Sequence, residues 1–181
     1  MAKKTTSRFS VNLHTCTAVT SIDKFAANNS TASPPRRWAL TTPRGVISCD
    51  YVIHATNGYA SHLLPHMSGS DGIIPVRGQV MALQADATLE TLTPTSWGAN
   101  QGFEYWFPRP VANPATDKPL IIIGGGREAA SPQFEMYIDD DSVVEPVVGK
   151  VLRGFLSSVF PEKFEEDKEP QMEWVSVIAC S

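Results

Sequence analysis

The sequence predicts an α+β fold, with a mixed or mainly antiparallel sheet and few helices. Many short strand-like stretches follow one another through turns and hairpins. Only two stretches carry a clear helical pattern. A doubly wound parallel sheet needs a helix after nearly every strand, so this arrangement argues against it. The 181 residues are enough for one domain and a small annex.

Composition and charge exclude several classes of function. Hydrophobic residues make up 42% of the chain and charged residues 19%, a balance typical of a globular protein. The formal net charge of −4 argues against nucleic acid as the main partner. No apolar run spans a bilayer and no signal peptide or peroxisomal signal is visible, so we expect no membrane contact and a cytoplasmic location. The scattered cysteines and histidines lack metal-ligand spacing, so we expect no metal site.

The first part of the chain predicts strands and one long loop. Residues 7–15 alternate between apolar and polar, which predicts a strand, and residues 18–22 extend or follow it. Residues 23–37 are rich in Asn, Ser and Pro and predict a loop. Residues 38–56 predict a hairpin whose turn lies at 43–45 and whose returning arm runs from Val46 to Ala55.

The remainder predicts the larger sheet and its helix. Residues 57–67 predict a short helix that stops near Pro65. Strands are predicted at residues 72–85, 103–110, 120–126 and 170–181. Residues 141–160 carry the longest helical pattern, with apolar residues spaced three and four apart. Asp141 or Ser142 would cap this helix, and Pro146 suits its first turn.

Three glycines in a row suggest a cofactor turn. Gly124, Gly126 and Ala129 fit the pattern G-x-G-x-x-G/A directly after a strand. A dinucleotide-binding turn also needs a helix that starts at once, and Pro132 limits any helix here to about one turn. We therefore interpret the glycines as the end of a strand. A nicotinamide-dependent reductase that uses this turn stays as an alternative.

Five stretches in a fixed order resemble one family of flavoenzymes. They read "CDYVIHATNGYASHLLP", "IIPVRGQVMAL", "EYWFPRP", "LIIIGGGRE" and "MEWVSVIACS". Together they resemble the FAD-dependent oxidoreductases of the D-amino-acid oxidase and glycine oxidase type, including fungal members. The resemblance extends from about Ser10 to Trp174 and is most specific between Tyr51 and Val80. It implies oxidation of a small amine or amino acid by hydride transfer from the α-carbon to flavin N5.

The resemblance implies FAD-binding roles for two regions. Val19 matches the strand whose backbone contacts adenine, and Ala55 through Asn57 match the strand end near the adenosine and pyrophosphate. Trp174 lies in the stretch that returns to the flavin ring. Each position also has a structural interpretation: Val19 and Trp174 as packing residues, and Asn57 as part of a helix-cap turn.

The same resemblance places Arg77, Tyr105 and Trp106 in the wall of the substrate cavity. An arginine suits a substrate carboxylate because its planar fork matches two oxygens. Arg77 could equally pair with an acid of the chain itself. Tyr105 and Trp106 point to opposite faces of one strand, so at most one of them faces the cavity well. No catalytic residue stands out, which suits a reaction carried by a cofactor.

The resemblance also divides the chain. Residues 10–66 would be part of a Rossmann-like FAD-binding domain, 67–165 the substrate-binding sheet and helix, and 166–181 the start of the return to the FAD domain. The family's G-x-G-x-x-G and Asp-Gly-x-Pro segments do not occur in the sequence. We therefore expect residues 1–181 to be a single fragment of such an enzyme, inactive and without FAD when alone. The alternative is a non-catalytic binding or assembly module derived from the substrate domain.

Overall fold

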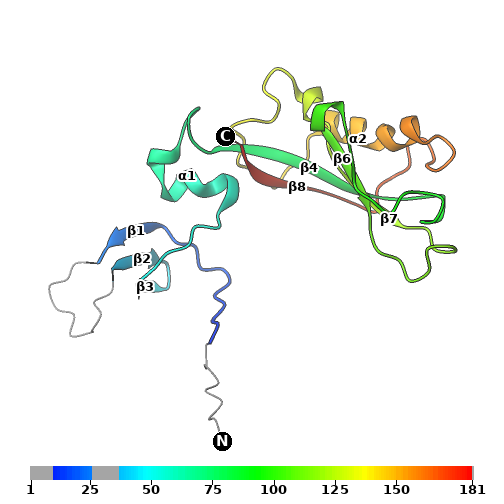
Figure 1. Cartoon of the computed structure of the whole chain (residues 1–181). Helices are drawn as coiled ribbons and strands as arrows, with labels where there is room; N and C mark the ends of the chain where they lie inside the picture. Colours follow the sequence, from blue (N-terminus) through cyan, green and yellow to red (C-terminus); the bar gives the residue numbers. More distant parts are fainter. Residues whose placement is uncertain (1–9, 26–36, 181) are drawn as a thin grey trace, which may run out of the picture. The chain divides into compact units, whose positions relative to one another are not determined.

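The computed structural model describes residues 10–25 and 37–180. The chain divides between His54 and Ala55 into two compact units (Figure 1). Most of the loop predicted at 23–37, and the start of the strand predicted at 7–15, lie outside the described residues.

The first unit contains a three-stranded antiparallel sheet in the order β1-β2-β3. Its strands are β1 (Ser21–Lys24), β2 (Trp38–Thr42) and β3 (Gly45–Cys49). The predicted hairpin is confirmed, and its turn is closed by the Thr42 hydroxyl, which donates to the Gly45 carbonyl at 2.7 Å.

Two strand predictions in this unit are wrong. The returning arm ends at Cys49 instead of Ala55, because Cys49 pairs with Trp38, the first residue of β2, and none of the described strands lies opposite residues 50–55. Residues 10–15 form no strand although they alternate, since alternation does not make a strand without a paired neighbour, and the strand predicted at 18–22 begins only at Ser21.

The second unit is built on a five-stranded antiparallel sheet in the order β5-β6-β7-β4-β8. Its strands are β4 (Ile74–Gln84), β5 (Trp97–Ala99), β6 (Glu104–Pro108), β7 (Leu120–Gly125) and β8 (Met172–Cys180). The two antiparallel sheets and few helices confirm the predicted α+β class. Strand β5 was not predicted, because three residues that include a glycine carry too little pattern.

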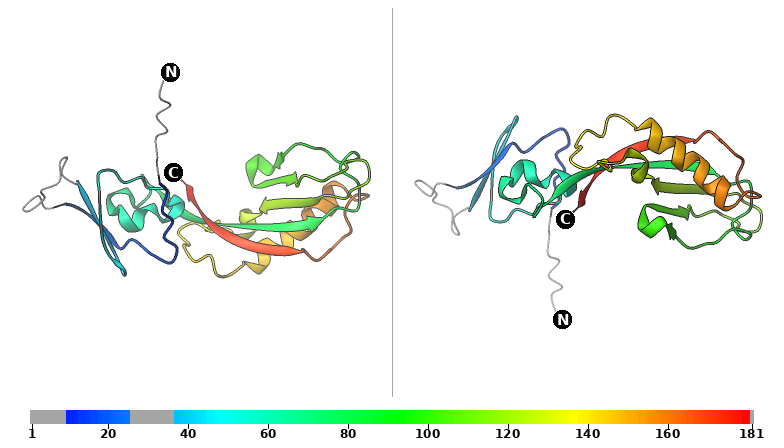
Figure 2. Two further views of the ribbon diagram at one scale, coloured as in Figure 1. Left: turned by 90° about the horizontal axis from the view of Figure 1, so that it is seen from below. Right: turned by 90° about the horizontal axis from the view of Figure 1, so that it is seen from above.

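Helix α2 (Pro146–Val159) covers one face of this sheet, as both views in Figure 2 show. Its apolar stripe forms a buried core with the strands, made of Val148, Leu152, Leu156, Met81, Leu83, Ile121, Ile123 and Trp106. Glu145, and not Asp141 or Ser142, caps the helix: its side chain accepts from the Val147 amide at 3.5 Å. Pro146 occupies the first turn as predicted, which places the cap one residue before it.

Short helical turns complete the second unit. The helix predicted at 57–67 consists of three pieces: η2 (Asn57–Tyr59), α1 (Ala60–Leu63) and η3 (Pro65–Met67). Turn η4 (Asn100–Gly102) precedes β6, and turn η5 (Arg127–Ala130) follows β7. As predicted, η5 lasts about one turn before Pro132. In the described part of the chain, no helix has the length and apolarity needed to cross a membrane.

Candidate functional site

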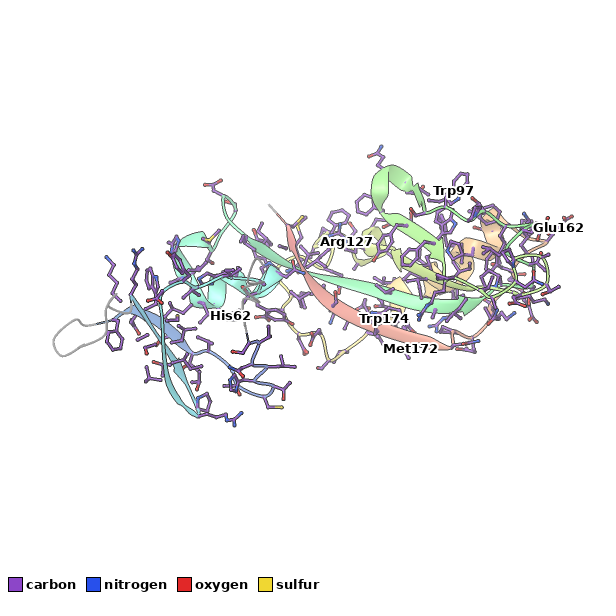
Figure 3. The ribbon with its side chains drawn as sticks, turned by 60° about the horizontal axis from the view of Figure 1, so that its bottom comes forward. His62, Trp97, Arg127, Glu162, Met172 and Trp174 are labelled. Carbon is purple, nitrogen blue, oxygen red and sulfur yellow. The ribbon has the colours of Figure 1, made fainter. Side chains whose placement is uncertain are left out.

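The face of the sheet opposite α2 is apolar and partly exposed. Directly opposed residues of antiparallel strands share a face, so the register defines two rows across it. One row is Tyr105, Gly124, Val80 and Trp174, and the next is Phe107, Ile122, Ala82 and Met172. Tyr105 is 44% exposed and Met172 63%. We call these eight residues the open face; Figure 3 labels Trp174 and Met172 on β8.

The phenol of Tyr105 lies across the neighbouring strand at Gly124. A Cβ added at Gly124 would come within 2.5 Å of the Tyr105 Cζ and closer still to its oxygen. Burial raises the pKa of Tyr105, and the nearby Arg127 charge opposes that effect. The phenol therefore stays protonated at neutral pH and presents a hydrogen-bond donor on an otherwise apolar face.

The other two glycines serve the turn that follows β7. Gly125 has φ +118° and lies against the backbone carbonyl of Phe103, where a Cβ would collide. Gly126 has φ +67°, and an added Cβ there would meet Leu152 at 3.4 Å. The strand-end interpretation of the three glycines thus agrees with the geometry, because each glycine has a packing or backbone role within the chain.

Arg77 lies on the face that α2 covers, and its guanidinium is fully engaged. Nε donates to Glu135, Nη1 donates to the Val143 carbonyl at 3.2 Å, and Nη2 donates to Glu145 at 3.5 Å. Only 9% of the residue is exposed. These contacts correspond to the alternative in which Arg77 pairs with acids of its own chain.

Trp106 also points to the covered face, away from Tyr105. It is 6% exposed and packs against Trp97 and Phe155, with ring centroids 6.4 Å and 5.3 Å away. It borders an apolar cavity of about 130 Å³ that is lined by Leu92, Thr93, Trp97, Trp106, Pro108, Ile121, Phe160, Lys163 and Phe164. Trp106 is thus separated from the open face by the sheet itself.

Arg127 was not among the predicted site residues. Its guanidinium carbon lies 5.9 Å from the Phe103 ring centroid, and its charge acts on the Tyr105 phenol. Among residues 10–25 and 37–180 it has no hydrogen-bond or ion-pair partner, and Nη1 is buried. The only signal in the sequence is its position directly after the glycines that end β7.

Comparison with known proteins identifies the family. Residues 3–181 match the sequence model of the DAO family, FAD dependent oxidoreductase. The chain belongs to this family. It resembles the crystal structure of glycine oxidase from Bacillus cereus, with a TM-score of 0.50 and 14% sequence identity, over 87% of this chain and 37% of that one. This likeness shows the fold alone, and the chain spans little more than a third of the glycine oxidase chain. No curated protein matches it.

The residues expected to bind FAD in this family lie in different local surroundings. In the first unit Val19 is half-buried next to Thr20, whose amide donates to the Thr41 carbonyl at 2.9 Å. In the second unit Ala55 is exposed, and the buried Oγ1 of Thr56 has no hydrogen-bond partner among the described residues. Trp174 lies on the open face in the same row as Tyr105.

Asn57 uses its side-chain amide within the chain. The amide nitrogen donates to the Val177 carbonyl at 3.3 Å, and its oxygen accepts from the Ala179 amide at 2.8 Å. The residue has φ +48°, a conformation that asparagine tolerates better than most residues. Its side chain therefore binds the outer edge of β8, while the helix-cap alternative lacks a side-chain cap bond in η2.

Proposed function

We propose that the open face forms the substrate side of an FAD-dependent oxidoreductase that acts on a small amine or amino acid. The observation that carries this proposal is the row of Tyr105, Gly124, Val80 and Trp174, in which one phenol and one indole share a partly exposed apolar surface. Small-molecule sites are mostly apolar with a few polar groups that fix orientation, and this row has that composition.

In this proposal the residues of the chain orient the substrate and exclude water. The Tyr105 hydroxyl donates a hydrogen bond to the substrate, because its raised pKa keeps the proton in place. Trp174 and Val80 supply flat apolar contact that removes water from the reacting carbon. When bound, FAD would supply the acceptor for the hydride that leaves the substrate's α-carbon.

For a substrate carboxylate we propose Arg127 ahead of Arg77. Arg127 has no acidic partner among the described residues and acts electrostatically on Tyr105, whereas Arg77 is already held by Glu135 and Glu145. A guanidinium without a partner can bind a carboxylate without first losing an ion pair. Arg77 and Trp106 would reach a substrate only if they left their present contacts.

The residues proposed for FAD fit that role to different degrees. Thr56 fits, because a buried hydroxyl without a partner is expected to bind a ligand or water. Ala55 fits because a small exposed residue allows close approach to the backbone. Val19 would act through its backbone in the first unit. Asn57 fits less well, since its amide is already bonded to β8.

A titration followed by NMR tests the substrate side without flavin. We expect acetate and glycine to shift the amide signals of Gly124 and Gly126 in the chain, and the neutral acetamide to do so much less. The Arg127→Gln variant should lose the preference for carboxylate. Arg109→Gln removes the same charge from an exposed residue outside the open face and should keep the preference. Equal responses to acetate and acetamide would rule out the carboxylate role.

Flavin binding, measured together with amine and carboxylate binding, separates the enzyme proposal from the module alternative. We expect the purified chain to carry no stoichiometric FAD, because its sequence lacks the family's phosphate-binding turn. A yellow protein with close to one flavin per chain would contradict this expectation. If neither FAD nor any amine or carboxylate binds, the substrate-side role fails, and a binding or assembly module becomes the better account.

A further inference from the structure

The buried carboxyl group of Glu104 and the partly exposed one of Glu128 meet where β6 begins and β7 ends. Glu104, the first residue of β6, is 0% exposed. Its Oε2 accepts from the Asn100 amide at 2.6 Å, while its Oε1 has no partner other than the Glu128 carboxyl, which lies within hydrogen-bonding reach. Glu128 belongs to η5, and its buried Oε2 likewise has no donor among the described residues.

Ionising Glu104 beside the Glu128 carboxyl is unfavourable without a cation between them, because Glu104 is fully buried. Within the described residues neither glutamate has an ion-pair partner. Helix α2 packs against η5, but its Lys150 is exposed and its Arg153 pairs with Glu169 and Glu173. Arg127 on η5 lies over the Phe103 ring, and strands β5 and β7 carry no charged residue. A single proton between the two carboxyls would form a hydrogen bond that includes both unpaired oxygens, Glu104 Oε1 and Glu128 Oε2.

We propose that Glu104 and Glu128 share one proton, and that this proton latches the η5 turn to the start of β6. Gly125 and Gly126, with φ +118° and +67°, form the hinge on which η5 is carried. Loss of the proton leaves two like charges facing each other in a buried site, and the turn is then released from β6. The pKa of Glu104 is raised to about 7, first by burial and then by the bond with Glu128, so release occurs near neutral pH.

The latch couples protonation to the surroundings of Tyr105. Arg127 lies on η5 beside Glu128, and its charge acts on the Tyr105 phenol, so release of η5 moves that charge. The Gly126 amide reports on the closed state, because it donates to the Phe103 carbonyl at 3.1 Å across the hinge. This inference concerns the chain alone and does not depend on flavin binding.

NMR of the full chain between about pH 5.5 and about pH 8.5 tests the latch around the pKa of Glu104, which is raised to about 7. The amides of Gly125, Gly126 and Arg127 should follow one common titration step. Hydrogen exchange at Gly126, corrected for its intrinsic pH dependence, should rise at least about tenfold across the step, the factor that corresponds to one pKa unit.

The Glu128→Gln variant should move the step to lower pH, because the glutamine amide donates to the Glu104 carboxylate and the second negative charge is gone, while burial of Glu104 remains. Glu104→Gln removes the titrating carboxyl and should abolish the step; if that fully buried variant does not fold, the partly exposed Glu128→Gln still decides. The control Glu162→Gln changes an exposed carboxylate elsewhere in the same unit and should leave the step unchanged. No common step in the unmodified chain, or a step at unchanged pH in Glu128→Gln, would overturn the proposal.

Discussion

At the residue scale, the three glycines show how one sequence pattern can arise from separate packing demands. Gly124 makes room for the Tyr105 ring, Gly125 for the Phe103 backbone, and Gly126 for the left-handed start of η5. The sequence alone supported the correct interpretation through Pro132, which stops a cofactor-binding helix. It could not show what fills the space above each glycine, because that depends on strand register.

A methyl group at Gly124 should destabilise the chain through Tyr105. The added Cβ would collide with the phenol, and overpacking of this kind costs about 1–3 kcal/mol in the free energy of unfolding. Urea denaturation measures the loss. Gly98→Ala on β5 is the control, because the nearest atom to a Cβ added there would be 3.6 Å away, an ordinary contact. The double variant with Tyr105→Ala should recover much of the loss, and strict additivity would argue against the collision.

Stability should fall as the pH rises through the range where Glu104 keeps its proton. The folded carboxyl holds its proton to a pKa of about 7, whereas in the unfolded chain it releases it near 4.5. Between these values the folded state binds more protons, so the free energy of unfolding decreases by up to about 1.4 kcal/mol per pH unit. Below and above this window the contribution is constant. Urea unfolding across the window should show this slope, and Glu128→Gln should narrow the window from its upper end, because it lowers the Glu104 pKa.

At the element scale, β8 is an edge strand that is partly closed by a side chain. Asn57 bonds to a carbonyl and an amide of β8 that would otherwise face a further strand. Capping an edge in this way limits strand addition by another chain. The family resemblance predicted that Asn57 contacts FAD. The long-range contact with Val177 and Ala179 could not be derived from local pattern.

Removing the Asn57 amide should loosen the end of β8. Asn57→Ala loses both hydrogen bonds and places an alanine at φ +48°, so we expect a loss of about 1–3 kcal/mol. Asn57→Gly keeps the backbone freedom and isolates the hydrogen-bond contribution. Hydrogen exchange of the Ala179 amide is the direct measurement. Unchanged protection of that amide in both variants would show that the side chain does not hold β8.

The strongest element predictions were the ones with a complete pattern. Strands β4, β6, β7 and β8 and helix α2 were predicted close to their observed bounds, because each strand is an apolar-rich stretch bounded by turn residues and the helix keeps a three-and-four spacing. The helix cap was predicted at the wrong residue. Ser142 donates both its backbone amide, at 2.9 Å, and its hydroxyl to the Asp140 carboxylate, so it does not cap the helix. The sequence predicted that Tyr105 and Trp106 point to opposite faces of the sheet. It could not predict which of the two faces α2 covers.

At the scale of the whole molecule, the chain consists of two units that differ in how much core they contain. The second unit has a continuous core between its sheet and α2, whereas the described strands of the first unit are mostly half-buried or exposed. The family and the α+β class were predictable from motifs that keep their order along the chain. The arginine proposed for a carboxylate was not, because the pairing of Arg77 with Glu135 and Glu145 joins residues 58 and 68 positions apart.

The open face should make the chain self-associate. Phe107 and Met172 are 40% and 63% exposed in one row of this face, and an apolar patch of this kind favours association between copies. We expect light scattering to show soluble oligomers or aggregates of the unmodified chain at concentrations where the double variant Phe107→Lys and Met172→Lys is monomeric. Lysine on an exposed strand face opposes association by charge without removing a core contact.

The control for this prediction lies on the covering helix. Val159 is 44% exposed at the last position of α2, where a lysine suits the helix terminus, so Val159→Lys adds charge away from the open face. If association is driven by the open face, this variant should aggregate like the unmodified chain, because net charge alone does not cover the apolar rows. If Val159→Lys prevents association as well as the double variant does, the effect is due to charge and not to the open face. If the unmodified chain is monomeric, the predicted self-association is wrong.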